Sequence, residues 1–246
     1  MAGVRVLKAR KDIDGRRIGV LGTSQGGWIS PLAATRSTDL AFVVVISASG
    51  INPMEQSIFN IENVLRGAGY SQEVINRASE LRNRLYARAR TGSFDGNFLI
   101  DLEKAHTEPW FELSELPYPV APSLSEGARR FLLFEPVPIW EKVKVPVLGL
   151  WGEHDIYLPA LKSKAIVEDA LVRGGNRNYT LKVYPHAEHG LTVVRLPADG
   201  WDFPRAVTGS RELIANWVAT QVLVRKRWRM NRQLTRDNHY MSYLIN

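Results

Sequence analysis

The segment Arg17-Ile18-Gly19-Val20-Leu21-Gly22-Thr23-Ser24-Gln25-Gly26-Gly27 carries the strongest indication of the fold class. Its first half, Arg17 to Gly22, is a short apolar run that ends in glycine, and such a run predicts a buried strand. The part from Gly22 to Gly26 fits the pattern G-x-S-x-G, in which a serine stands on a tight turn between a strand and a helix. The glycines two positions before and after Ser24 are expected to let this turn form without steric clashes.

Three further segments have the composition of buried strands. They are Phe42 to Ser47, Pro146 to Trp151 and Tyr179 to Tyr184, and the first is rich in β-branched residues. Helical sequence separates each strand from its neighbour along the chain. Strands that alternate with helices predict a parallel sheet with helices on its faces, so the expected fold class is α/β.

A long insertion interrupts this alternation between the second and third strands. Its pattern is that of amphipathic helices, with Ile58, Ile61, Val64 and Leu65 on one stripe and Ser71 as the expected N-cap of a further helix. We predict an α/β core over residues 1–50 and 135–224, a helical cap over residues 51–134 and a basic tail over residues 225–246.

The composition excludes several classes of protein. A chain of 246 residues with 45% hydrophobic and 23% charged residues can build one sizeable core. The absence of cysteine excludes disulfides and a cysteine nucleophile. No apolar run is long enough for a membrane span, and the first residues lack the apolar stretch of a signal peptide. As written, the sequence fits a cytoplasmic protein, but an upstream signal would be missing, so the compartment is left open.

The positive charge is concentrated at the C-terminal end. Six basic residues and one acidic residue, Asp237, give residues 225–246 a charge of +5, out of a formal net charge of +7 for the chain. Such a segment with aromatic residues between the charges could contact nucleic acid or an anionic membrane surface. Chain ends are more commonly solvated, and we expect no nucleic-acid partner.

Ser24 is the candidate nucleophile, and a serine nucleophile needs a base. His189 lies in a short loop after the fourth strand, where a parallel sheet delivers residues to its carboxyl edge. His186 is the alternative three residues earlier, and Gly190 favours His189 as the residue next to a turn. The backbone amide of Gln25, at the start of the following helix, is the candidate donor to an oxyanion.

A carboxylate that orients the base is expected after the third strand. Asp155 lies there in a loop opened by Gly152, and it would hold the imidazole in the required tautomer. Glu153, closer to the end of the strand, is the alternative. The resulting chain order of serine, aspartate and histidine differs from that of chymotrypsin-like and subtilisin-like enzymes.

These segments together resemble α/β-hydrolase-fold esterases and acyl-peptidase-like serine hydrolases. The resemblance rests on Asp14 to Trp28, Trp151 to Pro159 and Tyr184 to Leu191, and it extends over about residues 1–224 with the insertion much less specific. It implies a catalytic triad of Ser24, Asp155 and His189, a nucleophile elbow at Ser24, and a cap domain that shapes the substrate pocket.

The chain departs from this family pattern at its beginning. Members of the fold carry further strands and a loop with a second oxyanion donor before the nucleophile strand, whereas Ser24 stands almost at the start of this sequence. An N-terminally truncated hydrolase is therefore expected. The strand before Ser24 would then have one unpaired edge, and self-association through that edge is expected.

The expected activity is hydrolysis of carboxylic esters through an acyl-enzyme on Ser24, with a small-molecule ester or acyl-peptide as substrate. The alternatives are an acyl-peptidase or amidase with the same residues, or an inactive remnant of such an enzyme. The histidines are scattered, no H-E-x-x-H pattern occurs, and no phosphate loop or dinucleotide fingerprint is present. We expect no metal and no cofactor.

Overall fold

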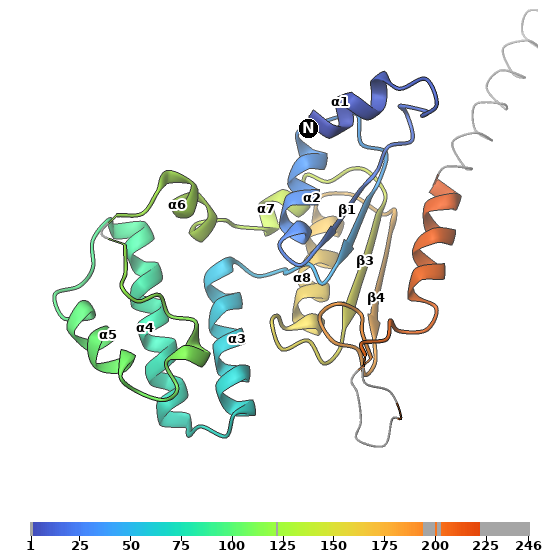
Figure 1. Ribbon diagram of the computed structural model, residues 1–246. Coiled ribbons are helices and arrows are strands. Elements are labelled where there is room, and N and C mark those ends of the chain that lie inside the picture. The colour runs from blue at the N-terminus through green and yellow to red at the C-terminus, as the bar shows by residue number, and fades with distance from the viewer. Residues whose placement is uncertain (1, 122, 194–199, 201–202, 222–246) are drawn as a thin grey trace, which may run out of the picture.

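Four parallel strands form the central sheet of the protein (Figure 1). The computed structural model describes residues 2–121, 123–193, 200 and 203–221. The strands lie side by side in the order in which they occur along the chain: β1 (Val20–Thr23), β2 (Val43–Ile46), β3 (Val147–Gly152) and β4 (Tyr179–Tyr184). All three pairings are parallel, with helices on the faces of the sheet. The expected parallel sheet and α/β class are confirmed.

The two inner strands are the most deeply buried. Val43, Val44 and Val45 are at most 1% exposed, and every residue of β3 is buried. Val43 lies opposite Val147, so the β-branched run of β2 packs directly beside the apolar run of β3. Continuous apolar runs of this kind are typical of parallel strands that are covered on both faces.

The first strand begins later than its apolar run suggested. The guanidinium of Arg17 pairs with the carboxylate of Asp14 at 3.0 Å, and the Arg17 amide donates to the Asp14 carbonyl at 2.9 Å. These bonds hold residues 14–17 in a turn, and the pairing with β2 runs from Val20 to Thr23. Among the described residues, β1 pairs with no strand on its other side and forms one edge of the sheet.

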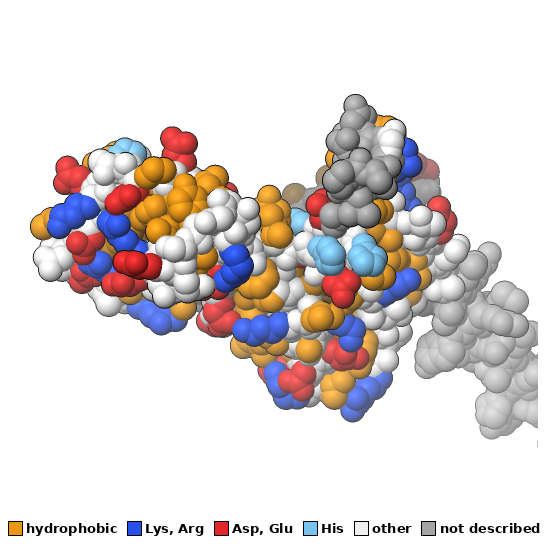
Figure 2. Space-filling view, turned by 90° about the horizontal axis from the view of Figure 1, so that it is seen from below, with side chains coloured by type: hydrophobic (Ala, Val, Ile, Leu, Met, Phe, Trp, Pro, Cys, Tyr) orange, Lys and Arg blue, Asp and Glu red, His pale blue; other side chains and the backbone are white. Residues whose placement is uncertain are grey.

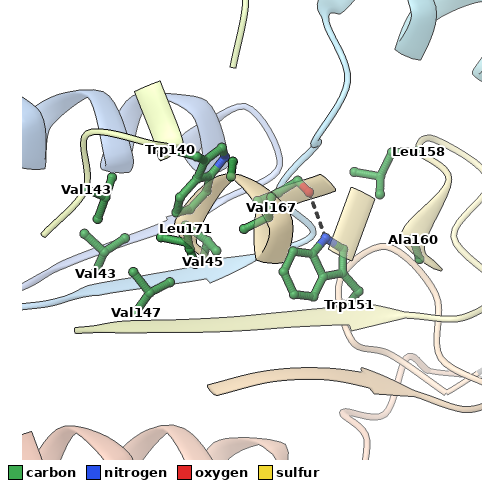
Figure 3. Packing of buried hydrophobic residues seen from close by; sticks show 12 residues of the cluster. Val43, Val45, Trp140, Val143, Val147, Trp151, Leu158, Ala160, Val167 and Leu171 are labelled. Carbon is green, nitrogen blue, oxygen red and sulfur yellow. Dashed lines mark hydrogen bonds between the residues drawn. The ribbon is translucent and has the colours of Figure 1, made fainter. Parts of the chain in front are cut away.

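One face of the sheet is covered by α2 (Gly26–Thr35), α7 (Val137–Trp140) and α8 (Ala160–Arg173). Trp140, Trp151 and Leu171 fill the space between these helices and the strands, each fully buried (Figure 3). The indole nitrogen of Trp151 donates to the Ala48 carbonyl at 2.7 Å, so this buried polar group is satisfied.

The opposite face is covered by the helix over residues 210–221. Trp217 of this helix meets Phe42 edge to face, with ring centroids 5.9 Å apart. Residues of β2 alternate between the two faces, since Val43 and Val45 belong to the cluster under α8 whereas Phe42 and Val44 belong to the cluster under Trp217. The short helix α1 (Ala2–Ala9) has no buried residue.

The insertion between β2 and α7 forms a separate group of helices beside the sheet (Figure 1). Ile61 and Leu65 lie in its own hydrophobic cluster, and the Ser71 hydroxyl accepts from the Val74 amide, so the predicted N-cap is confirmed. The two ends of the insertion lie close together, as shown by the hydrogen bond that the Asn52 side chain donates to the Glu135 carboxylate at 3.4 Å. Its elements are α3 (Pro53–Gly67), α4 (Gln72–Thr91), α5 (Phe98–His106), the 3₁₀ helix η1 (Glu112–Ser114) and α6 (Glu126–Leu132).

The predicted basic tail, residues 225–246, lies outside the described residues. Within the described part of the chain, no helix has both the length and the apolar character needed to cross a membrane. The boundaries predicted for core and cap stay predictions.

Candidate functional site

Ser24 stands on the turn that joins β1 to α2, as the G-x-S-x-G pattern led us to expect. Its φ angle is 54°, in the left-handed region that non-glycine residues rarely adopt. Two backbone bonds hold this conformation: the Ser24 amide donates to Ile46 at 2.9 Å, and the Gly27 amide donates to the Ser24 carbonyl at 2.7 Å. Strained backbone of this kind is characteristic of functional sites, where the surrounding structure maintains it.

The neighbouring glycines are needed for close packing. A Cβ atom on Gly22 would lie 2.2 Å from the Gly26 carbonyl oxygen, and one on Gly27 would lie 2.5 Å from the Cα of Ala48. A Cβ atom on Gly26 would meet nothing within 4 Å. The expected steric role therefore holds for Gly22, but at the other end of the turn it belongs to Gly27, because that residue presses against the chain that leaves β2.

Asp155 and His189 form a direct pair between the loops after β3 and β4. The Nδ1 atom of His189 lies 2.7 Å from Oδ2 of Asp155. The other carboxylate oxygen accepts from the amides of Tyr157 and Leu158 at 2.8 and 3.1 Å. The Asp155 side chain is fully buried and that of His189 is 21% exposed, so a fixed carboxylate supports an imidazole that can still be reached.

The two alternative residues lie elsewhere. His186 is exposed, and its ring packs edge to face against His154 with centroids 5.5 Å apart. Glu153 is exposed, and its carboxylate is 4.0 Å from His154. Neither side chain contacts the Asp155 and His189 pair through a hydrogen bond in the described structure.

Ser24, Asp155 and His189 follow β1, β3 and β4, so the parallel sheet carries all three to its carboxyl edge. Tyr157 lies near both Ser24 and His189. It lines the same pocket as Ser24, and its ring centroid is 5.0 Å from that of His189. Among the described residues, the Ser24 hydroxyl makes no hydrogen bond to His189. Catalytic hydrogen bonds are often long in a free enzyme and tighten when the substrate binds.

Gln25 occupies the N-cap position of α2 and has helical φ and ψ angles of −53° and −30°. Its side chain makes no capping bond, and its backbone amide has no acceptor among the described residues. The amide is therefore free to donate to an oxygen placed beside Ser24, at the positive end of the helix dipole.

The pocket beside Ser24 has a volume of about 330 Å³ and lies between the sheet and the insertion. In the view from below, the insertion and the sheet body form two masses, and hydrophobic side chains are exposed on both (Figure 2). The pocket lining comes from the β1–α2 turn, from four helices, from the β3–α8 loop and from the residue after η1: Ser24, Gln25, Trp28, Pro53, Gln56, Ser57, Asn60, Tyr86, Glu115, Phe131 and Tyr157.

The sequence did not reveal Ser47 as part of this site. Ser47 directly follows β2. It has a φ angle of 50° and no exposed surface, and its hydroxyl donates to the His189 carbonyl. The only signal available was its position at the end of a buried strand. Within the described part of the chain, no group of three or more histidine, aspartate or glutamate side chains is placed to hold a metal ion.

Residues 2–115 match the family described as BAAT / acyl-CoA thioester hydrolase C terminal, which is less than half of the chain. No curated protein sequence matches the chain at a significant level. Solved structures that are similar include the Pyrococcus horikoshii acylaminoacyl peptidase, with 17% identity and a TM-score of 0.39 over 76% of this chain. Est1E from Butyrivibrio proteoclasticus has 19% identity and a TM-score of 0.41 over 76% of this chain. The Paleococcus ferrophilus monoacylglycerol lipase has 15% identity and a TM-score of 0.46 over 89% of it.

The chain spans 22% of the length of the peptidase, 58% of that of Est1E and 72% of that of the lipase. These identities are low, so the fold assignment rests on the architecture of the chain itself: a parallel sheet with helices on both faces and a serine on the turn from strand to helix. The chain is therefore assigned to the α/β class, and its similarity to the acyl-CoA thioester hydrolase family is limited to residues 2–115.

Proposed function

We propose that the protein is a serine hydrolase that cleaves carboxylic esters through an acyl-enzyme on Ser24. The observation that carries the proposal is the buried Asp155 carboxylate, 2.7 Å from the His189 ring, at the same edge of the sheet as the left-handed Ser24. In this proposal Ser24 is the nucleophile, His189 is the general base and acid, and Asp155 orients His189. The turn at Ser24 acts as the nucleophile elbow.

In the first half of the reaction, the Ser24 Oγ atom attacks the ester carbonyl while the Nε2 atom of His189 takes the hydroxyl proton. Asp155 holds the Nδ1 proton and stabilises the positive charge that develops on the ring. The oxygen of the tetrahedral intermediate accepts a hydrogen bond from the free Gln25 amide. Collapse breaks the bond to the alcohol oxygen, which leaves with the proton from His189.

In the second half, water replaces the alcohol. His189 removes a proton from the water, whose oxygen attacks the acyl carbon, and the second intermediate collapses to release the carboxylic acid and return the proton to Ser24. In this scheme every proton that moves between Ser24, the leaving alcohol and the water passes through His189.

Thioester hydrolysis is a second candidate, motivated by the family match over residues 2–115. The same residues would serve, because a thiol is a better leaving group than an alcohol and makes less demand on His189 as an acid. Amide or peptide cleavage, as in an acyl-peptidase or amidase, would require His189 to protonate a poorer leaving group.

The proposal is tested by labelling with a fluorophosphonate probe and by rates on a p-nitrophenyl ester, an S-acyl thioester and an aminoacyl nitroanilide. Ser24→Ala should abolish labelling and all turnover, whereas Ser93→Ala, a change at an exposed serine of the insertion, should leave both unchanged. Labelling that persists in Ser24→Ala would refute the assignment of the nucleophile. A folded wild-type chain that neither labels nor turns over any substrate would indicate the inactive remnant.

A further inference from the structure

The pocket beside Ser24 has one wall made of hydrogen-bonding side chains from α3. Gln56 and Asn60 are four residues apart and Ser57 and Asn60 three apart, so all three share one face of this helix. Each side chain carries both a donor and an acceptor and is uncharged. A wall of this kind suits a ligand with several hydroxyl groups better than an alkyl chain, which would leave these polar groups without partners.

Asn60 has an unsatisfied amide in this wall. Its Nδ2 atom is enclosed by protein and has no hydrogen-bond partner among the described residues. On the same helix, Asn63 donates its amide to the Phe59 carbonyl four residues earlier at 2.8 Å. Asn60 does not use the corresponding Gln56 carbonyl. A buried donor without an acceptor is costly, so the Asn60 side chain would gain a hydrogen bond by rotating its amide toward a ligand oxygen in the pocket that it lines.

Glu115 is the one charged side chain that lines the pocket within the described structure, and no lysine or arginine does so. Its backbone is left-handed, with a φ angle of 51°, and the preceding Ser114 carbonyl accepts from the buried Arg82 guanidinium at 2.6 Å. Burial lowers the pKa of Arg82, while the nearby Glu115 partly opposes this effect. A carboxylate at the rim accepts hydrogen bonds from hydroxyl groups and repels anionic ligands.

The pocket adjoins the position of the leaving group. In the proposed mechanism the alcohol oxygen receives its proton from His189, so it must lie beside that ring. Tyr157 lines the pocket and packs on His189 with ring centroids 5.0 Å apart. The lining also includes Trp28 and Phe131, whose rings meet edge to face at 5.7 Å and offer apolar contact to C–H groups.

Resting on the proposed function, we infer that the pocket binds the alcohol part of the ester and that this alcohol is a small polyhydroxylated ring, as in a monosaccharide ester. Asn60 and Gln56 would bond its hydroxyl groups, and Glu115 would accept from them. These residues would determine which ester is cleaved, while the acyl carbon reacts at Ser24 independently of them.

The experiment compares two acetate esters of similar shape, methyl 6-O-acetyl-glucopyranoside and cyclohexylmethyl acetate, by acetate release. We expect kcat/KM to be at least about ten-fold higher for the sugar ester, since a site built for hydroxyl groups rejects analogues that lack them. Asn60→Leu and Gln56→Leu should lower kcat/KM for the sugar ester about ten- to a hundred-fold. Both changes should lower kcat/KM for the sugar ester by a larger factor than they change the rate on the cyclohexylmethyl ester or the rate of fluorophosphonate labelling. Gln72→Leu, the same change at an exposed position of α4, is the matched control.

A second measurement separates this inference from the proposed chemistry. Binding of the same two esters to the Ser24→Ala protein is followed by saturation-transfer NMR, which needs no turnover. Binding of the sugar ester that weakens in Ser24→Ala/Asn60→Leu would support the inference even if the protein hydrolysed neither ester. Equal binding of both esters, or a preference that is unchanged by the Asn60 substitution, would overturn it while leaving the role of Ser24 intact.

Discussion

The hydroxyl group of Ser47 donates a hydrogen bond to the backbone carbonyl of His189, which ties the end of β2 to the loop after β4. The Ser47 amide donates in turn to the Leu150 carbonyl at 2.8 Å, so the contact is anchored in the sheet. Ser47 thus fixes the backbone of the residue whose ring meets Asp155. We infer that it is a positioning residue for His189.

Ser47→Ala is expected to slow fluorophosphonate labelling of Ser24 about ten-fold. This factor corresponds to the net free energy of the one hydrogen bond that positions the backbone of His189. Ser47→Gly should slow it similarly while relieving the left-handed backbone, because it too lacks the hydroxyl. Ser49→Ala is the matched control, since its buried hydroxyl bonds to Ile51 instead. Labelling at the normal rate in Ser47→Gly would mean that only the backbone conformation matters.

The two histidines of the β4 loop should differ sharply in their importance. His189→Ala removes the ring that pairs with Asp155 and should lower ester kcat by several orders of magnitude, whereas His186→Ala changes an exposed side chain and should have little effect. Rates on a p-nitrophenyl ester measure both. Comparable losses in the two variants would contradict the assignment of the base.

Asp155→Asn tests the orientation of the base. The asparagine can still accept from the amides of Tyr157 and Leu158, so the loop should keep its fold. Its amide group would face Nδ1 of His189 and favour the wrong tautomer, with a loss of about 10⁴-fold in kcat. Glu153→Gln changes an exposed carboxylate outside the pair and should retain nearly full activity. Similar losses of kcat in Asp155→Asn and Glu153→Gln would show that the loss of a negative charge in this loop, and not the orientation of His189, lowers the rate.

The insertion has a core of its own, and Leu65 lies in it without exposed surface. Leu65→Ala should destabilise the protein by about 2–5 kcal/mol through the cavity it leaves. Leu99→Ala, at a position that is 54% exposed, should cost far less. Urea unfolding measures both, and equal losses would show that the insertion is less tightly packed than the structure indicates.

The open edge of β1 is expected to promote self-association. Leu21 is 55% exposed on this strand, beside backbone groups that no other described strand pairs. Leu21→Lys should shift the protein toward smaller species in light scattering across a concentration series, because a charge on an edge strand opposes pairing. If the unchanged protein and Leu21→Lys are both monomeric at every concentration, the edge of β1 is not an interaction surface.

The sequence predicted those parts of the fold that depend on local composition. The runs around Val43 and Val147 became strands because β-branched and apolar residues fill a sheet that is covered on both faces. The pairing of Asp155 with His189 could be anticipated, because both residues follow parallel strands and therefore reach the same edge. The first strand was predicted too long, since the Asp14 and Arg17 contact is a local bond that hydrophobicity does not report.

Other parts of the site depend on contacts between distant segments. Ser47 adopts a left-handed conformation that serine does not favour by itself, and it is held by contacts with Leu150 and His189, which are distant in the sequence. Asn60 and Glu115 reach the pocket because α3 and the residue after η1 are packed beside the sheet. The amphipathic pattern predicted the helices of the insertion but carried no information about which side chains would face Ser24.

The bond between Asn52 and Glu135 has a consequence for how the fold can be altered. The chain leaves the sheet and returns to it at almost the same point, and side-chain contacts such as that between Trp28 and Phe131 also join the helices from α3 to α6 to the sheet body. An exchange of this segment for another of different length would leave the strand order and the Ser24 turn in place. A foreign segment grafted between the same two residues would therefore change one wall of the pocket without changing the sheet that carries Ser24.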